Sequence, residues 1–532
     1  MQMSRRASFA IVVAATLGLA ACGEFGSDSG AATPSDPDAG TTPDSGLPPV
    51  GGGATRGITV TAGEAGKTAF VMQSKTTTVP IKLDRRSASV GPVLITVTGL
   101  PKDATVDPLT IAANAVDGTL TVRAASTTPQ GTLSLDVTAL EQVPNGASGT
   151  AKLAAFVRGL PGTLDTTFGT NGVVNDVFGA SDSTATSARI TQDGSIVVSG
   201  RRATTLALAR FTTAGVLDLT FAGGLGRASV GAAQGSLFLD IHEGKTPADG
   251  FISAVSSGTT SASVFRAKLD GLLNTTFGGT GSVSMTLGLG NYNGRQTSAL
   301  ADGTALVLTA HVGTTKAGVV SRWKANGALD TTYGAGSGVC QLTASGTSGT
   351  LNGVPRMFVK ADGSARVVLS LADGTGAVKG CTPAGLLDTT LGSTPDYVVA
   401  LPGLSVDAAP YFDGGIVALR QTAWSRVNAA FVGDTALANV PLAPITSAVA
   451  LITQADGGIV VVGAGDTANA TLVRFKLTGL RDPDFGTAGV SPVSLSPIGA
   501  IVYGMVAQPD GRILVFGSSS DHFDGVIARV WP

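Results

Sequence analysis

The chain has 532 residues, more than a single hydrophobic core usually organises, so we expect two or more folding units. Its formal net charge is −2 and it contains no cluster of lysine or arginine, which argues against nucleic acid or an anionic membrane surface as a partner. Glycine occurs 73 times, only 14% of residues are charged and 5% are aromatic. This composition favours short strands joined by tight turns, and therefore an all-β fold.

The N-terminus has the pattern of an export signal. The first 22 residues, MQMSRRASFAIVVAATLGLAAC, place two arginines before an apolar stretch that ends in small residues and a cysteine. The tetrapeptide LAAC, ending at Cys22, resembles the lipobox of bacterial lipoproteins. That resemblance implies a signal peptide at 1–21, cleavage before Cys22 and lipidation of its sulfur. It also implies an exported protein anchored through lipid, at the outer membrane or cell surface because Gly23 follows the cysteine. A plain secretory leader is the alternative.

Two different segments follow the signal. Residues 22–55 consist mainly of Gly, Ser, Thr, Asp and Pro, which bury no core, so we expect a disordered tether. Residues 56–158 contain short alternating runs such as GITVTA, TVPIKLDR, VLITVTGL and GTLSLDVTAL, which predict an antiparallel β-sandwich. The run VTGLPKDATVDPLTIAANAVDGTLTVRA resembles the immunoglobulin-like repeats of bacterial surface proteins. The resemblance implies a spacer or a minor adhesion module.

Residues 160–532 repeat internally. The first marker is a motif that reads GTLDTTFGTNGVV at 162–174 and recurs five more times, for example as ALDTTYGAGSGV from 328. The second marker is an Asp-Gly pair between an apolar run and a β-rich run, at intervals of about 43 to 60 residues. Its aspartates are Asp193, Asp249, Asp302, Asp362, Asp413, Asp456 and Asp510. The spacing therefore predicts seven equivalent units.

Each unit has the pattern of four antiparallel strands. ATSARITQDGSIVVSG predicts two strands joined at Asp-Gly, LALARFTTAG a third, and the motif leads into a fourth such as GVVNDVF. Seven such units predict a seven-bladed β-propeller, with a solenoid as the alternative. Because the chain stops on a third strand, we expect residues near 164–178 to complete the last blade and hide both sheet edges.

The motif itself is predicted to be a structural staple. Its aspartate is expected to close an Asx turn, and its aromatic side chain to fill the crevice between adjacent blades. The predicted staple residues are Asp165, Phe168, Asp218, Phe221, Phe277, Asp330, Tyr333, Asp482 and Phe485. In one copy Asn274 replaces the aspartate, and in another copy Leu391 replaces the aromatic residue. In the fifth unit the motif is not recognisable, so we predict weaker stapling there.

The combination of LDTTFGxxGV, QxDGxIVVxG and ALARF resembles the delta-60 repeat proteins of bacterial surfaces. The resemblance covers residues 160–532, because the three motifs recur in register. It implies a β-propeller and attaches no general activity to it.

Arginine recurs just before the end of the third strand, which allows two interpretations. The positions are Arg210, Arg266, Arg322, Arg474 and Arg529, with Gly380 at the same place in the fourth unit. These arginines would form a positive ring for an anionic ligand, or each would pair with a motif aspartate. A feature that repeats with the fold usually serves the fold, so we favour the ion pairs.

Catalytic and metal-binding patterns are weak. The three histidines, His242, His311 and His522, lie in different units without metal-ligand spacing. Ser321 and Lys324 spell S-x-x-K, but residues three apart on a strand face opposite sides. We therefore predict no catalytic residues, metal or cofactor. Cys340 and Cys381 are the other two cysteines. In an exported chain they could form a disulfide or remain two free thiols, and the sequence leaves both alternatives open.

These patterns lead to three functional hypotheses. The first is a non-enzymatic, lipid-anchored surface protein, monomeric, whose propeller binds a protein or a glycan. The second is a propeller hydrolase or lyase with its site at the mouth of the channel. The third is a purely structural envelope spacer. Fold alone does not choose among them.

Overall fold

In the computed structural model the described residues are 55–532, without 233–234, 245–249, 257–261, 288–290, 313–317, 343–354, 371–375, 392–404, 430–431, 466–469, 498 and 521–522. Thr55–Pro532 forms one compact unit. The signal, Cys22 and the predicted tether up to residue 54 lie outside this range. Within it the only helical elements are two short 3-10 turns, η1 (Ala222–Gly224) and η2 (Thr435–Leu437). No helix in this part of the chain is long and apolar enough to cross a membrane.

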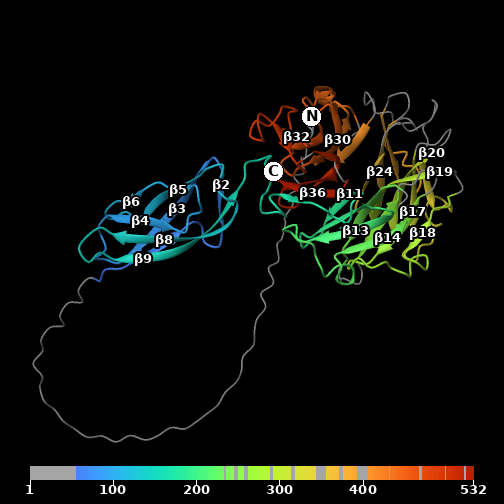
Figure 1. Ribbon diagram of the computed structural model, residues 1–532. Helices are drawn as coiled ribbons and strands as arrows, with labels where there is room; N and C mark the ends of the chain where they lie inside the picture. The colour runs from blue at the N-terminus through green and yellow to red at the C-terminus, as the bar shows by residue number, and fades with distance from the viewer. Residues whose placement is uncertain are drawn as a thin grey trace, which may run out of the picture. The chain divides into compact units, whose positions relative to one another are not determined.

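Strands β1 to β9, coloured blue to cyan in Figure 1, form two sheets. The first contains, in spatial order, β1 (Ile58–Ala62), β3 (Thr76–Arg85), β7 (Asp117–Ala124) and β5 (Ala104–Val106). The second contains β2 (Ala69–Met72), β9 (Ser148–Arg158), β8 (Gly131–Glu141), β4 (Val93–Thr98) and β6 (Leu109–Ile111). One hydrophobic core joins both sheets, with Ile81 and Leu120 from the first and Leu135 and Val137 from the second. The predicted sandwich is therefore present.

The sandwich differs from the prediction in one strand pair. β2 runs parallel to β9, with Ala69 opposite Ala155, whereas all other pairs of the two sheets are antiparallel. A wholly antiparallel sandwich was therefore the wrong prediction. Alternation within each run shows which residues face the core, but it holds for parallel and antiparallel neighbours alike.

The remaining strands form seven separate sheets among the described residues, which we call blades 1 to 7. Blade 1 contains β11 (Ser183–Ile190), β12 (Ile196–Arg202), β13 (Thr205–Phe211) and β14 (Arg227–Ala232); blade 2 contains β15 (Leu237–His242), β16 (Phe251–Ser256), β17 (Ser263–Ala267) and β18 (Ser282–Ser284). Blade 3 contains β19 (Asn291–Ala299), β20 (Ala305–Val312), β21 (Gly318–Trp323) and β22 (Val339–Leu342); blade 4 contains β23 (Arg356–Val359), β24 (Ala365–Ser370) and β25 (Gly376–Cys381). Blade 5 contains β26 (Ser405–Pro410), β27 (Ile416–Arg420), β28 (Ala423–Val427) and β29 (Val440–Pro441).

Blades 6 and 7 complete the set. Blade 6 contains β30 (Ser447–Thr453), β31 (Ile459–Ala464), β32 (Ala470–Phe475) and β33 (Val490–Val493). Blade 7 combines β34 (Ala500–Ala507), β35 (Ile513–Ser519) and β36 (Gly525–Val530) with β10 (Val173–Val174) from the other end of the repeat region. The number of sheets equals the number of predicted units.

The blades form a closed ring, which is the arrangement of a β-propeller. The first strands of successive blades contact one another in order from β11 to β34, and β11 also contacts β34. β10 pairs with β36, placing Val173 opposite Ala528, so residues from the start of the repeats supply the last strand of blade 7 as predicted. An open solenoid was the wrong alternative. Figure 1 shows these strands in colours from green to red.

Burial on both faces explains the apolar strands of the ring. All six residues of β36, GVIARV, are buried, whereas β3 in the sandwich alternates between exposed and buried positions. Seven hydrophobic clusters lie between neighbouring blades, including one between blades 7 and 1 that contains Leu514 and Ile196. A sheet packed between two others has no solvated face, so its strands lose the alternation.

Candidate functional site

The recurring motif starts with an aspartate whose side chain closes a turn. Oδ1 of Asp165 accepts hydrogen bonds from the backbone N–H of Thr167 at 3.1 Å and from its hydroxyl at 2.6 Å. Asp218 is bound in the same way by Thr220, at 2.9 and 2.6 Å. The corresponding backbone bond is accepted by Asn274, Asp330, Asp388 and Asp482. Each copy therefore forms the Asx turn that its sequence predicts.

The motif aromatics lie between the blades. These five aromatic residues are at most 2% exposed: Phe168, Phe221, Phe277, Tyr333 and Phe485. Each belongs to a different inter-blade hydrophobic cluster. The five side chains therefore fill five of the crevices between neighbouring blades. Leu391, in the copy without an aromatic, is only partly buried.

Most motif copies dock onto the glycine that opens the next copy. A Cβ atom added to Gly271 would lie 2.4 Å from the ring of Phe221, and the φ angle of Gly271 is +85°. Only glycine meets both requirements, close approach and a left-handed backbone. The last copy docks onto the first, because the N–H of Gly486 donates to the carbonyl of Pro161 at 2.8 Å. This contact joins the last copy to the first and closes the ring of staples at its seam.

The recurring arginines pair with the motif aspartates. Nε of Arg210 donates to Asp218 at 2.6 Å, and Nε of Arg529 donates to Asp165 at 2.8 Å. Further pairs join Arg322 to Asp330, Arg426 to Asp434 and Arg474 to Asp482. Burial opposes ionisation of Asp218, but the bonds from Thr220 and Arg210 outweigh it and hold the pKa of Asp218 below its usual value. These arginines are neutralised within the fold and do not form a free positive ring.

Two blades achieve the pairing differently. In blade 4 Gly380 occupies the arginine position, and Arg366 from the neighbouring strand β24 pairs with Asp388 at 2.9 Å. A Cβ on Gly380 would lie 2.6 Å from the Arg366 guanidinium, so glycine leaves the necessary space. In blade 2 Asn274 carries no charge, and Arg266 donates instead to the carbonyl of Gly303 at 2.6 Å. Burial lowers the pKa of Arg266 to about 10.

Blade 5 contains the motif copy that sequence inspection missed. The N–H of Asp434 donates to the Arg426 carbonyl at 3.0 Å, and Oδ1 of Asp434 accepts from the N–H of Ala436 at 3.1 Å. Leu437 takes the place of the aromatic and is 6% exposed, in the cluster between blades 5 and 6. The prediction that this unit lacks the motif is therefore wrong. The eight-residue separation between Arg426 and Asp434, which Arg210 and Asp218 share, would have revealed it.

Replacing Asp434 by alanine tests this assignment. We expect the free energy of unfolding to fall by about 1 kcal/mol, because the variant loses the cap of η2 and one of the two carboxylate partners of Arg426, which keeps Asp413. Urea unfolding followed by tryptophan fluorescence measures the change. The matched control is Asp434→Asn, which keeps the acceptor oxygen, as Asn274 does, and should lose less. Equal stability of the alanine variant and the native chain would contradict the assignment.

Cys340 and Cys381 form a disulfide. Their Cα atoms are 6.2 Å apart, and 41 positions separate them in the sequence. Cys340 lies on β22 at the outer edge of blade 3 and Cys381 on β25 of blade 4, so the bond links neighbouring blades. Both residues are at most 2% exposed and belong to the cluster around Tyr333.

The remaining catalytic candidates do not assemble into a site. The hydroxyl of Ser321 is buried and accepts a hydrogen bond from the indole N–H of Trp323 at 2.9 Å, while Lys324 pairs with Asp330. His242 packs against Phe251, with ring centroids 5.8 Å apart. The side chains of His311 and His522 lie outside the described residues. Within the described part of the chain, no three His, Cys, Asp or Glu side chains cluster in a way that would hold a metal ion.

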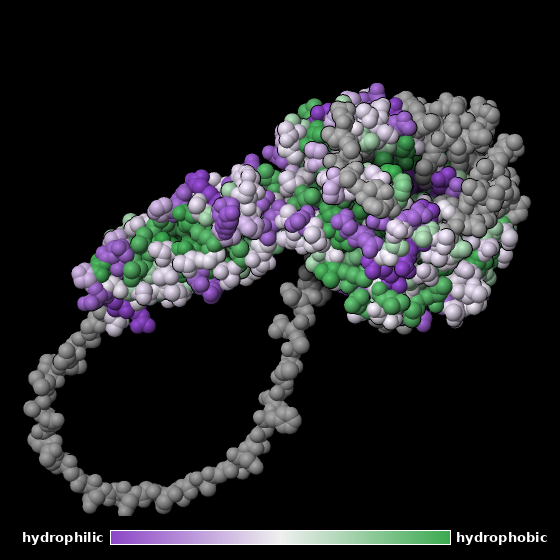
Figure 2. Space-filling model, in the orientation of Figure 1, coloured by the Kyte–Doolittle hydropathy of each residue, from purple (hydrophilic) through white to green (hydrophobic). Residues whose placement is uncertain are grey.

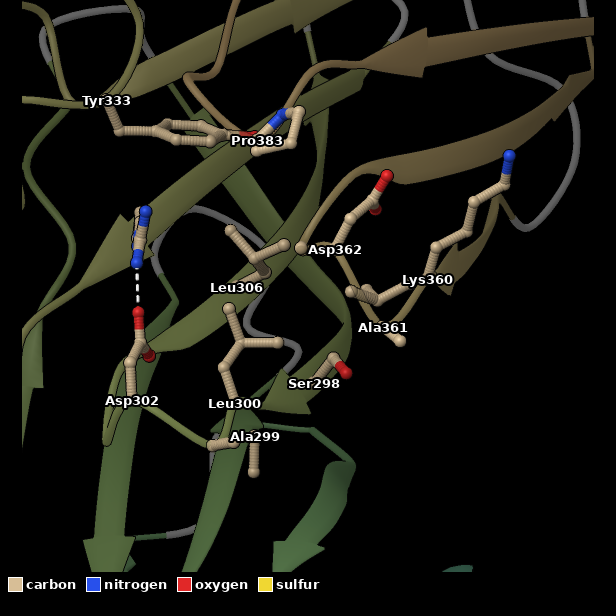
Figure 3. A pocket seen from close by; sticks show the side chains of 14 residues that line it. Ser298, Ala299, Leu300, Asp302, Leu306, Tyr333, Lys360, Ala361, Asp362 and Pro383 are labelled. Carbon is tan, nitrogen blue, oxygen red and sulfur yellow. Dashed lines mark hydrogen bonds and ion pairs between the residues drawn. The ribbon is translucent and has the colours of Figure 1, made fainter.

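A cavity of about 500 Å³ lies between blades 3 and 4 (Figure 3). Its apolar wall contains Leu300, Leu306 and Pro383. Its polar wall contains Asp302 and Arg322, which form an ion pair, together with Lys360 and Asp362. The size and the mixture of apolar surface with a few polar groups are typical of ligand sites. We call it the crevice site.

Tyr333 adds an unusual group to the crevice site. Its side chain is 1% exposed, and its hydroxyl has no hydrogen-bond partner among the described residues. The equivalent residue in the other aromatic copies is phenylalanine, so the hydroxyl is not needed for stapling. Burial raises the pKa of Tyr333, which keeps the hydroxyl protonated and able to donate. Tyr333 therefore places a buried hydroxyl without a partner among the residues that line the crevice site.

Exposed apolar side chains recur at the turns of the motif. They follow the turn glycine or its equivalent and are 46–70% exposed: Val216, Leu272, Leu386, Val432 and Leu480. Because the positions are equivalent in the repeat, they lie at the same end of the ring. Figure 2 shows hydrophobic residues on the surface among hydrophilic ones. The end of the propeller with the motif turns therefore presents some apolar surface.

Comparison with known proteins supports the fold. A family model described as a domain of unknown function (DUF5122) beta-propeller matches residues 191–221, which run from the β11–β12 turn through β13 to Phe221. The chain contains a β-propeller. No curated protein matches it.

Several solved structures resemble the chain weakly. The intramolecular trans-sialidase from Ruminococcus gnavus is 10% identical with a TM-score of 0.25, and the match covers 85% of this chain and 92% of that one. Invasin, a bacterial integrin-binding protein, is 13% identical with a TM-score of 0.14, covering 89% and 79%. Domains 4–9 of the surface layer protein SbsC are 11% identical with a TM-score of 0.15, covering 89% and 82%. At this level of similarity the function of the propeller has to be inferred from its own residues.

Proposed function

We propose that this chain is a non-enzymatic, lipid-anchored protein of the outer membrane or cell surface whose propeller binds a protein or a glycan. The export signal and the LAAC sequence at Cys22 support the anchor. The sandwich, with its resemblance to immunoglobulin-like repeats, would act as a spacer. The polar residues that recur in the repeats support binding over catalysis, because they are engaged in the Asx turns and ion pairs of the fold.

The observation that carries the proposal is the crevice site. It combines apolar side chains with Asp302, Lys360, Asp362 and the unpartnered hydroxyl of Tyr333. Sugars and protein loops both present hydroxyl or carbonyl oxygens beside apolar patches, so either would match this lining. The blades hold the site rigidly, because Tyr333 lies in the inter-blade cluster that also contains the disulfide. A rigid support reduces the entropy lost on binding.

The experiment measures binding of the purified full-length chain to a glycan array and to fractionated envelope proteins. We expect saturable binding that weakens about 10-fold in Tyr333→Phe, a change to the residue that other copies use. Asp362→Asn should also weaken binding. The matched control is Asp193→Asn in blade 1, because both aspartates accept one backbone N–H in equivalent turns, at 2.8 and 2.9 Å.

The same experiment on cells tests the anchor. Cys22→Ser should release the chain into the medium while the released protein still binds. Unchanged binding by Tyr333→Phe and Asp362→Asn would contradict the crevice as the site. Absence of saturable binding in both panels would contradict the binding function, and retention of Cys22→Ser on cells would contradict lipid anchoring.

A further inference from the structure

The centre of the ring contains a second cavity, of about 210 Å³, which we call the channel cavity. It is lined by residues from the first strand of all seven blades, β11, β15, β19, β23, β26, β30 and β34. It is separate from the crevice site, with which it shares no lining residue. An inference about it therefore goes beyond the function proposed above.

Two of the three arginines that line the channel cavity are neutralised. Nε of Arg189 donates to Asp240 at 2.9 Å, and Arg356 forms an ion pair with Asp407. Both carboxylates also bind a backbone N–H of a neighbouring blade, that of Ala299 at 3.0 Å for Asp240 and that of Leu451 at 2.9 Å for Asp407. These carboxylates are therefore occupied in holding the inner strands together.

Arg295 is the exception. It lines the channel cavity, its Nε is buried, and neither a hydrogen bond nor an ion pair reaches its side chain from the residues that the structure describes. Burial, and secondarily the charge of Arg356, lower the pKa of Arg295. Elsewhere in the ring, the recurring arginines of the third strands obtain a carboxylate or a carbonyl partner. An unpaired, partly buried cation is unfavourable unless an anion occupies the adjoining space.

The backbone explains why Arg295 faces the channel. The register of β19 against β20 shifts between Gly294 and Gln296, so Arg295 is the extra residue of a β-bulge. A bulge redirects the side chain of the extra residue and often occurs beside functional sites. β34 contains the equivalent bulge at Tyr503, which also lines the cavity and is 39% exposed. The repeat thus provides a position at the channel, and the sequence places a cation and an aromatic ring there.

We propose that the channel cavity binds a small organic anion whose carboxylate pairs with Arg295. Guanidinium binds planar oxyanions through two parallel hydrogen bonds, which explains the preference for a carboxylate. Phe238, Phe358 and Tyr503 provide an apolar and aromatic wall for the remainder of the molecule. At about 210 Å³ the cavity has room for a small acid.

The test is a titration of the native full-length chain with acetate, benzoate, phosphate and sulfate at constant ionic strength, followed by calorimetry and thermal unfolding. We expect saturable binding of a carboxylate, tighter for benzoate than for acetate because of the aromatic wall. Arg295→Gln should weaken that binding at least 10-fold. The control is Arg123→Gln on the sandwich, which removes the same charge at an exposed position far from the ring in sequence.

A second measurement covers the variant's own stability. Without ligand, Arg295→Gln should unfold at the same or a higher temperature than the native chain, because it removes a charge without a partner. Benzoate should raise the unfolding temperature of the native chain and of Arg123→Gln but not of Arg295→Gln. Binding of phosphate or sulfate alone would overturn the carboxylate assignment. Absence of saturable binding, or equal affinity in Arg295→Gln, would overturn the site.

Discussion

Replacing Asp165 by alanine should lower the free energy of unfolding of the propeller by about 3–5 kcal/mol, the typical loss when one partner of a buried ion pair is removed. Asp165 is fully buried and accepts from Arg529 at 2.8 Å and from Thr167, and it lies 3.1 Å from Arg512. Arg529 is itself 3% exposed, so the variant leaves a buried guanidinium without its carboxylate. Asp165 belongs to the segment that closes the ring through β10. Chemical denaturation followed by circular dichroism measures the effect.

Two variants separate the causes of this loss. Asp165→Asn keeps the Asx-turn acceptor and removes only the charge, so it should lose less than the alanine variant. Asp117→Asn, at an exposed position on β7 of the sandwich, should leave stability nearly unchanged. If Asp165→Ala unfolds at the same denaturant concentration as the native chain, the closing ion pair does not stabilise the ring.

Removing the disulfide by the double substitution Cys340→Ala and Cys381→Ala should lower the free energy of unfolding by about 4 kcal/mol. The estimate follows from the loop entropy that a cross-link over 41 residues removes from the unfolded chain. The effect should appear in the transition of the ring, because the bond joins blades 3 and 4. In the native chain, reductant without denaturant should act slowly, since both sulfurs are buried.

The control for this prediction is Cys22→Ala, which removes a cysteine outside the ring and should not change its unfolding. Peptide mapping without reductant should recover one fragment that contains both Cys340 and Cys381. Two free thiols in the exported protein, or equal stability of the double variant, would contradict the prediction.

Much of the fold was predictable because it repeats. The Asp-Gly pairs and the motif spacing predict the number of sheets and the four strands of six of them, whereas blade 4 has three strands among the described residues. The chain's end on a third strand predicts the pairing of β10 with β36. The motif predicts both the Asx turn of Asp165 and the burial of Phe168, because each depends on neighbours close in the sequence or on a position common to all copies. Local and periodic signals are the ones that a single sequence carries.

The errors have a different origin. Blade 4 has Gly380 at the arginine position, and Arg366 on the adjacent strand pairs with Asp388 instead. The spacing of residues along the sequence does not reveal a partner that comes from a neighbouring strand. The motif copy at Asp434 was missed because the residues around it differ from those of the other copies, although its backbone hydrogen bonds are the same. The crevice site was not predicted, because the lining residues of blades 3 and 4 are brought together only when the two sheets pack.

The amino-acid sequence by itself determined the all-β class, the repeated four-stranded unit and the turns that staple one unit to the next, because these depend on residue type and short spacing. The repeat also predicted that the recurring arginines pair with the motif aspartates, whereas tertiary structure alone decided that Arg295 is left without such a partner among the described residues. Arg210 and Arg295 are both arginines on strands, but Asp218 reaches the first, and a bulge directs the second into the channel cavity. The physical reason is that pairing depends on distances across blades and strands, and those distances exist only after the ring has closed.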